Sequence, residues 1–255
     1  MRTAPIELPV SALTALLEWE GAGEPHQVLR PEVVWREPGE QAALIRATLD
    51  ALAAAGVMTA PGQVDRDLRD LLPLLTTPTV EYSGWFTADG RTKGVLAAAG
   101  ALDAVVAVRD GDRVRITPVP PDRLTDALIT ELPDVRAGRG SSFVVTAADI
   151  DDLRAPSDVS ERRVPEHVAR MVELAHQAVR DGGELYAVSR DALGRCVTRG
   201  PVWYADTDDG RYLNYTLGAG DALRIVVAPG TPSSLVEALA SVRAPVGRQA
   251  GRTAR

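Results

Sequence analysis

A short motif occurs twice in this chain, and this internal repeat constrains the fold more than any other feature. The first copy, Gly111–Ile116, has the sequence Gly-Asp-Arg-Val-Arg-Ile and is followed by Pro120. The second copy, Gly220–Ile225, has the sequence Gly-Asp-Ala-Leu-Arg-Ile and is followed by Pro229. Because junctions of strand, proline and helix are common, the order of the surrounding elements must decide whether the repeat is more than chance.

The same order of elements, helix, two hairpins and helix, is predicted twice. In the first half the pattern predicts a helix over Gln41–Gly56, hairpins at Asp89-Gly90 and at Asp110–Asp112, and a helix from Pro121 to about Leu132. In the second half it predicts the helix Pro165–Arg180, strands at Ser142–Thr146, Leu185–Ser189, Cys196–Tyr204, Arg211–Tyr215 and Leu223–Val227, and a last helix capped by Thr231-Pro232. The sequence therefore predicts two similar halves, about 41–135 and 142–242, in one domain over 1–242.

The remaining elements are shorter. Ile6–Val10 alternates as a strand does, and Ser11 is a predicted N-cap for a helix through Trp19. Val28–Trp35 is mixed and is predicted as a strand, and Val64–Leu72 as a helix. The polar segment Arg154–Arg163 is expected to be mobile, and the arginine-rich residues 243–255 to form a disordered basic tail.

Composition limits the class of protein. The chain is 45% apolar, which is enough for a packed core, and its net charge of −7 argues against a general nucleic-acid binder. Cys196 is the only cysteine, so the chain offers no disulfide and no multi-thiolate metal site, which suits a reducing cytoplasm. Neither a signal peptide nor an apolar run long enough for a membrane span is visible, so we expect a cytoplasmic protein without membrane insertion.

Residues that usually carry catalysis are sparse. His167 and His176 fall on opposite sides of one predicted helix, and His26 is in a predicted loop, so the three histidines are expected to be structural or solvent-exposed. A lone strand cysteine such as Cys196 is usually a small core residue. The sequence shows no motif for a nucleotide, a metal or a nucleophilic serine. We therefore expect no catalytic residue, no metal and no cofactor, and a binding role.

Five separate passages together resemble the EspG family, the secretion-associated chaperones of type VII (ESX) systems. The likeness covers about residues 6–242 and rests on the order and spacing of the passages. They are Leu16–Trp19 with Gly21–Pro25, Leu49–Gly56 with Asp65–Leu72, Asp112–Val119 with Glu131–Pro133, Tyr204–Thr207 with Gly210–Tyr212, and Pro229–Pro232.

This resemblance implies an α+β fold, with a mostly antiparallel central sheet, flanking helices and two quasi-symmetric halves. It also implies a non-enzymatic chaperone or adaptor, which binds the exposed helical tip of the PPE protein in a PE–PPE-like heterodimer and directs the pair to its secretion system. Two alternatives stay open: an enzyme with a motif-less site between the two halves, and a scaffold that binds the secretion machinery. The cognate substrate and the oligomeric state are not predicted.

Four residues are candidates for contact with the substrate protein. Asp89 and Arg91 flank the tip of a predicted hairpin and are expected to be exposed. Trp85 and Trp203 are in predicted strands near the two hairpins. Exposed aromatic side chains are good anchors at an interface, although a large aromatic residue in a strand is more often part of the core.

Overall fold

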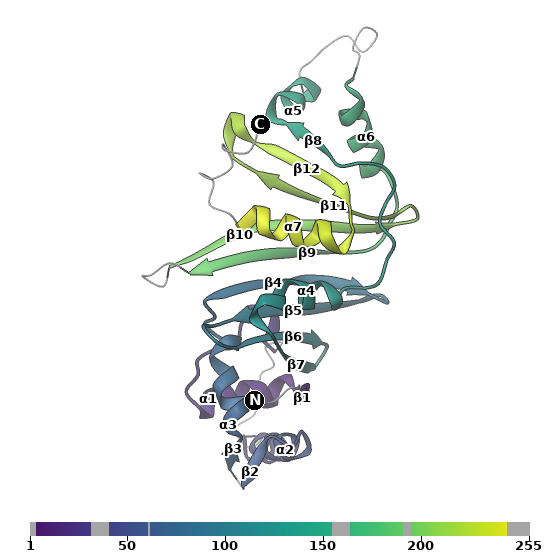
Figure 1. The fold of residues 1–255 in the computed structure, drawn as a ribbon. Coiled ribbons are helices and arrows are strands. Elements are labelled where there is room, and N and C mark those ends of the chain that lie inside the picture. The colour runs from purple at the N-terminus through teal and green to yellow at the C-terminus, as the bar shows by residue number, and fades with distance from the viewer. Residues whose placement is uncertain (1–3, 32–40, 61, 155–163, 191–194, 244–255) are drawn as a thin grey trace. The chain divides into compact units, whose positions relative to one another are not determined.

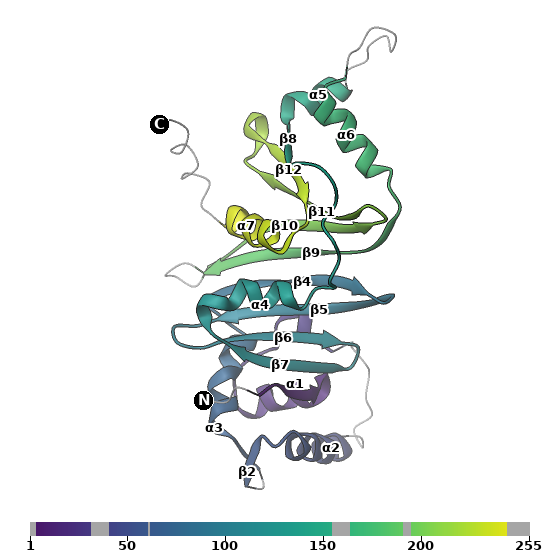
Figure 2. The ribbon, with the colours of Figure 1, turned by 45° about the vertical axis from the view of Figure 1, so that its right-hand side comes forward.

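The structure is a computed structural model, and it describes residues 4–31, 41–60, 62–154, 164–190 and 195–243. The chain divides into two compact units. The first unit holds the described residues up to Leu132 together with Val188–Val197, and the second holds those of Pro133–Ala187 and those from Thr198 onward. The pairings between neighbouring strands in each unit are antiparallel, and helices flank the strands (Figures 1 and 2), so the α+β prediction is confirmed.

The first unit is built on five antiparallel strands. Their spatial order is β1 (Ile6–Pro9), β7 (Arg113–Val119), β6 (Ala104–Asp110), β5 (Arg91–Ala99) and β4 (Val80–Ala88). The strand β1 is the outer one, is four residues long and ends at Pro9. A separate two-stranded hairpin pairs β2 (Met58–Ala60) with β3 (Gln63–Val64).

One face of these strands carries the core of the first unit. Leu96, Ala107 and Ile116 of the strands are buried in one cluster with Leu13, Leu16 and Leu17 of the helix α1 (Val10–Trp19). The 3₁₀ helices η1 (Gln27–Leu29) and η3 (Leu72–Leu75) and the helices α2 (Gln41–Ala54) and α3 (Arg66–Leu71) add buried residues to this cluster.

The opposite face is only partly covered. The 3₁₀ helix η4 (Pro121–Arg123) leads into the helix α4 (Leu124–Thr130), which packs on β5 and β6 through the buried Leu124 and Leu128. Because side chains alternate along a strand, Val95 and Val108 point to this face, away from the α1 core. The part of the face beside the β4–β5 turn therefore remains available for a site.

Three predictions about the first unit are corrected. Ser11 is not the N-cap of α1, because the helix begins at Val10, whose N–H group donates to the carbonyl oxygen of Asp112 at 2.7 Å. The predicted strand at Val28–Trp35 is wrong at its start, where residues 27–29 form η1, and residues 32–35 lie outside the described ranges. Helix α3 begins two positions later than predicted, at Arg66, after Asp65 caps it.

The second unit also has five strands, in the order β9 (Val179–Arg190), β10 (Cys196–Thr207), β11 (Gly210–Leu217), β12 (Arg224–Pro229) and β8 (Phe143–Thr146). The helix α7 (Pro232–Arg243) packs on β11 and buries Leu235, Ala238, Leu239 and Val242. The helix α6 (Glu166–Ala175) lies against β8, which is the outer strand and four residues long. The helix α5 (Ala147–Arg154) follows β8 directly and was not predicted, and residues 155–163 lie outside the described ranges.

The predicted helix Pro165–Arg180 is too long. The helix α6 ends at Ala175, β9 starts at Val179, and Val172, Ala175 and Val179 are exposed. Gly182 lies inside β9, where a Cβ atom would be 2.7 Å from the carbonyl oxygen of Tyr204. The glycine therefore allows a close approach of two strands.

The repeated motif has the same order of elements in both copies. In the first, Gly111 precedes β7, which leads to α4, and in the second, Gly220 precedes β12, which leads to α7. Both glycines have positive φ, 62° and 56°, which L-residues with a side chain rarely adopt.

The hydroxyl of Thr231 accepts from the Ser234 N–H group at 3.0 Å, so the predicted cap of α7 is confirmed. Among the described residues, no helix is long and apolar enough to span a membrane.

Candidate protein-binding site

The β4–β5 hairpin presents two of the four candidate residues. Ala88 pairs with Arg91, and the two residues between them, Asp89 and Gly90, have φ angles of 53° and 71°. These are the positive φ angles that a two-residue type I′ turn requires, so the predicted turn is confirmed. Asp89 and Arg91 are both exposed.

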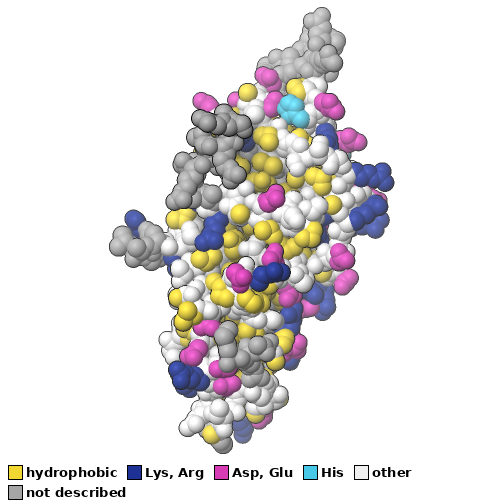
Figure 3. All heavy atoms as spheres, viewed as in Figure 1, with side chains coloured by type: hydrophobic (Ala, Val, Ile, Leu, Met, Phe, Trp, Pro, Cys, Tyr) yellow, Lys and Arg dark blue, Asp and Glu magenta, His cyan; other side chains and the backbone are white. Residues whose placement is uncertain are grey.

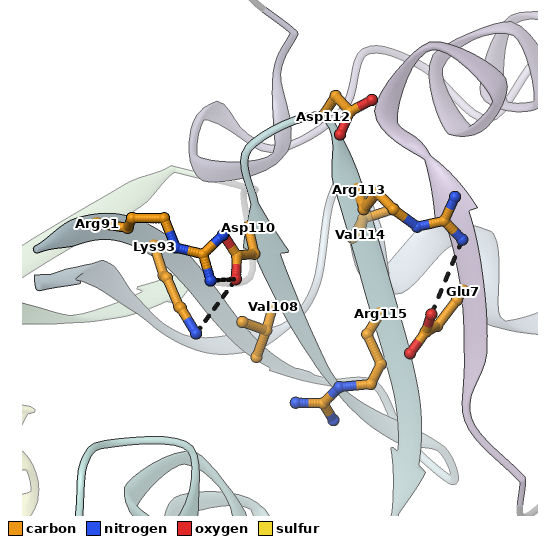
Figure 4. Close-up of a pocket in the computed structure, with 9 residues that line it drawn as sticks. All are labelled: Glu7, Arg91, Lys93, Val108, Asp110, Asp112, Arg113, Val114 and Arg115. Atoms are coloured by element: carbon orange, nitrogen blue, oxygen red, sulfur yellow. Dashed lines mark ion pairs between the residues drawn. The ribbon is translucent and has the colours of Figure 1, made fainter. Parts of the chain in front are cut away.

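Beside this hairpin the uncovered face of the first unit forms a groove, which we call the charged groove (Figure 4). Its volume is about 400 Å³. Strand pairing explains the lining, because Lys93, Asp110 and Arg113 are aligned across three neighbouring strands and share one face. The lining residues are Glu7, Arg91, Lys93, Val108, Asp110, Asp112, Arg113, Val114 and Arg115.

Ion pairs fix most of the charged side chains in the groove. Asp110 Oδ2 contacts both Arg91 Nη2, at 3.3 Å, and Lys93 Nζ, at 3.2 Å. On the β1 side, Arg113 Nη2 lies 3.8 Å from Glu7 Oε2, and both side chains are more than half exposed. Asp112 points away from the other side chains in Figure 4. Asp110 is therefore shared between two cations.

Arg115 is held by a pair of hydrogen bonds to Glu131, which follows α4. Its Nη1 and Nη2 atoms donate to Glu131 Oε1 and Oε2 at 3.1 and 2.5 Å, and Nη1 also donates to the hydroxyl of Thr117. These hydrogen bonds raise the pKa of the Arg115 guanidinium. Arg115 therefore has a fixed position in the groove and a permanent charge.

The two tryptophans have different environments. Trp85 pairs with Gly94, so it points away from Lys93 to the other face of the first unit, where it is half-buried against the α1 core. Trp203, in the second unit, is 44% exposed. Register places Trp203 on the same face as Phe143, over whose ring Arg170 of α6 lies at 5.1 Å. Of the two, Trp203 has the exposure that an anchor requires.

The structure thus brings Arg91 into a charged groove that sequence reasoning missed. Of the additional residues, Lys93, Asp110 and Arg115 line the groove, and Glu131 holds Arg115. Charged and apolar side chains alternate in Arg113–Thr117, and Arg91 and Lys93 are two positions apart in one strand. Both patterns indicate a charged face. The sequence pattern does not show how the strands align with one another, so it could not predict that these residues meet. On the face in Figure 3, basic and acidic side chains are interspersed.

One cluster in the second unit contains the residue types of a catalytic triad. Asp149 Oδ2 accepts from the hydroxyl and the N–H group of Thr146, at 2.6 and 2.8 Å, and lies 3.2 Å from His167 Nε2. The Thr146 hydroxyl is the main cause that lowers the pKa of Asp149 to about 2. Because Asp149 stands between Thr146 and His167, the histidine is not placed to activate the hydroxyl, and the cluster is a capping box for α5.

The other histidines also have structural partners. His26 Nε2 is 3.0 Å from Glu81 Oε1, and the two side chains are 11% and 5% exposed. His176 Nδ1 lies 2.8 Å from the carbonyl oxygen of Val172 in α6. Within the described ranges, no group of three or more histidine, cysteine, aspartate or glutamate residues could hold a metal ion.

These elements define an α+β protein in which each of two units is built on five antiparallel strands, with a charged groove beside an exposed hairpin in the first unit. The model of the EspG family matches residues 9–241, and the chain belongs to the EspG family.

A solved structure has a similar fold: the Mycobacterium tuberculosis type VII secretion system chaperone EspG5, in complex with the PE25–PPE41 dimer. The TM-score is 0.66 and the identity 15%, and the match covers 94% of this chain and 95% of EspG5. No curated protein sequence matches this chain.

Proposed function

We propose that this protein is a cytoplasmic, non-enzymatic chaperone that binds a PE–PPE-like heterodimer through the helical tip of its PPE subunit and directs the pair to a type VII secretion system. The observation that carries this proposal is the family match over residues 9–241. The similar fold of EspG5, which was solved with a PE–PPE dimer, supports it.

The physical task is to cover an apolar helix tip until secretion. Such a tip would otherwise expose a contiguous apolar patch, and patches of this kind bind other apolar surfaces without selection. The second unit offers an exposed tryptophan, Trp203, for apolar contact, and the hairpin of the first unit offers Asp89 and Arg91 for polar contact. Charges at a rim determine the choice of partner more than the affinity.

Reversal of the hairpin charges tests this proposal. The double variant Asp89→Arg with Arg91→Asp should bind the PE–PPE pair about tenfold more weakly, because the rim charges would then oppose those of the partner. Candidate pairs are those encoded near the gene of this protein, and co-expression with size exclusion identifies a pair that co-elutes. Calorimetry then gives the affinity, and a thermal melt of the free variant checks the fold.

The matched control is Arg66→Asp with Asp70→Arg on α3. These residues form an exposed ion pair at 3.6 Å, so the control makes the same charge exchange outside the hairpin. The control should bind as the wild type does. Unchanged affinity of a folded hairpin variant would remove the hairpin from the interface, and separate elution of every pair from the wild type would remove the chaperone function itself.

A further inference from the structure

Positive charge is left over at one end of the charged groove. Arg91 and Lys93 both contact the same oxygen, Asp110 Oδ2, so two cations share one carboxylate. Arg115, by contrast, has a carboxylate of its own in Glu131. The excess of about one positive charge is local to Asp110, because Asp112, which also lines the groove, points away from it in Figure 4. This end of the groove therefore favours an anion.

The donors for an anion are already in place. The ammonium group of Lys93 has three N–H groups, and the contact with Asp110 uses one of them. Its side chain is 23% exposed, so the group is accessible yet partly shielded from water. Partial burial strengthens a charge-assisted hydrogen bond relative to one on the open surface.

An apolar floor separates Lys93 from Arg115. Val108, on the middle strand β6, pairs with Arg115, is 7% exposed and lines the groove. In Figure 4, Lys93 and Arg115 extend from the strands on either side of it. A ligand with methylene groups above Val108 and a carboxylate near Lys93 would match both the apolar floor and the ammonium group. This is the chemistry of a glutamate or aspartate side chain.

We propose that the charged groove receives an acidic side chain of the partner protein, with Lys93 as the contacting group. This inference rests on the proposed function, because the partner is the bound substrate protein. Arg91 belongs to both the hairpin and the groove, so the hairpin tip adjoins the end of the groove that holds Lys93. The groove, at about 400 Å³, is much larger than one carboxylate and has room for the segment that carries it.

The first test uses the free protein. Because Lys93 is the only lysine, growth of the expression host on ¹³C,¹⁵N-labelled lysine labels this side chain alone and leaves its three N–H groups and its positive charge unchanged. The Lys93 signal is the one that the variant Lys93→Arg lacks. Glutarate, a carboxylate on a short aliphatic stem, should shift this signal with saturation, whereas neutral glutaramide should not. A shift that sodium chloride reproduces at equal ionic strength would overturn the carboxylate site.

The second test uses a PE–PPE pair that co-elutes with the wild type. The variant Lys93→Gln should bind it about tenfold more weakly, since a partly shielded charge pair loses one member. The control Arg66→Gln removes the same charge from α3, where the side chain is 88% exposed, and should bind as the wild type does. A thermal melt checks that Lys93→Gln is folded.

The two tests separate the inference from the function on which it rests. If the pair binds Lys93→Gln as tightly as the wild type, the assignment of Lys93 is overturned while the chaperone function stands. If no pair binds the wild type, the proposed function fails, and with it the assignment of a partner protein to the groove. The glutarate titration still decides whether the groove is a carboxylate site.

Discussion

Arg211 links three segments of the second unit through its side chain and its backbone. Its Nε and Nη2 atoms donate to Asp206 Oδ1 and Oδ2 at 2.6 and 2.7 Å, and its guanidinium lies 4.4 Å from the centre of the Tyr204 ring. The Arg211 carbonyl oxygen accepts from the N–H groups of Gly138 and Gly230. The side chains of Arg211 and Asp206 are about 4% and 6% exposed, so the pair is isolated from water.

Removal of this arginine should destabilise the protein strongly. The variant Arg211→Met leaves the buried Asp206 carboxylate without its partner, so we expect a loss of about 3–5 kcal/mol in the free energy of unfolding. Arg180→Met is the control, because Arg180 pairs with Asp208 at 2.5 Å where both side chains are 73% exposed, and it should cost less than about 1 kcal/mol. Denaturant unfolding measures both. Equal losses of unfolding free energy in the two variants would show that the burial of the Arg211–Asp206 pair does not add to stability.

At the scale of elements, a close backbone approach in the first unit that depends on a glycine is between β5 and η1. A Cβ atom at Gly94 would lie 2.6 Å from the carbonyl oxygen of Val28, which belongs to η1. At Gly100, just after β5, the nearest atom is the terminal Cδ2 of Leu74, at 3.2 Å. A backbone oxygen fixed in a turn cannot move aside as a flexible side chain can.

The two glycines therefore predict different costs for the same substitution. Gly94→Ala should push η1 from the strand and lower the free energy of unfolding by about 1–3 kcal/mol. Gly100→Ala should cost less, because a small change in the side-chain dihedral angles of Leu74 moves its Cδ2 atom away. Thermal or denaturant unfolding of both variants gives the comparison. A Gly94→Ala variant as stable as Gly100→Ala would mean that η1 adjusts at no cost.

The elements also show where sequence reasoning succeeded and where it stopped. The Asp89-Gly90 turn and the Thr231 cap were predictable, because their chemistry lies within a few neighbouring residues. Ser11 failed as a cap because the partner of the first helical N–H group comes from Asp112, remote in sequence. The charged groove was not predicted for a related reason. Lys93, Asp110 and Arg115 meet only through the register of three strands.

At the scale of the whole molecule, the two candidate tryptophans belong to different units. Trp85 packs against the core of the first unit, whereas Trp203 is exposed in the second. Both were expected as either anchors or core residues, and the structure favours a different role for each. The substrate-binding role of Trp85, Asp89, Arg91 and Trp203 stays a prediction.

Alanine substitution of each tryptophan separates these roles. Trp203→Ala should weaken binding of a PE–PPE pair about tenfold with little change in stability, since exposed aromatic anchors carry a large share of binding energy. Trp85→Ala should lower the free energy of unfolding by up to about 3 kcal/mol, since it removes a half-buried ring from the core. Calorimetry and thermal melts measure the two effects. Undiminished affinity of Trp203→Ala would exclude this face of the second unit from the interface.

The strands β1 and β8, one outer strand in each unit, have a consequence for self-association. An outer strand exposes unpaired N–H and C=O groups, and it can act as a template on which further strands add until fibrils form. Both outer strands here, β1 and β8, are four residues long, and β1 ends in a proline, which has no N–H group to donate. Such short edges template poorly, so β1 and β8 are not expected to start fibrils of the protein itself.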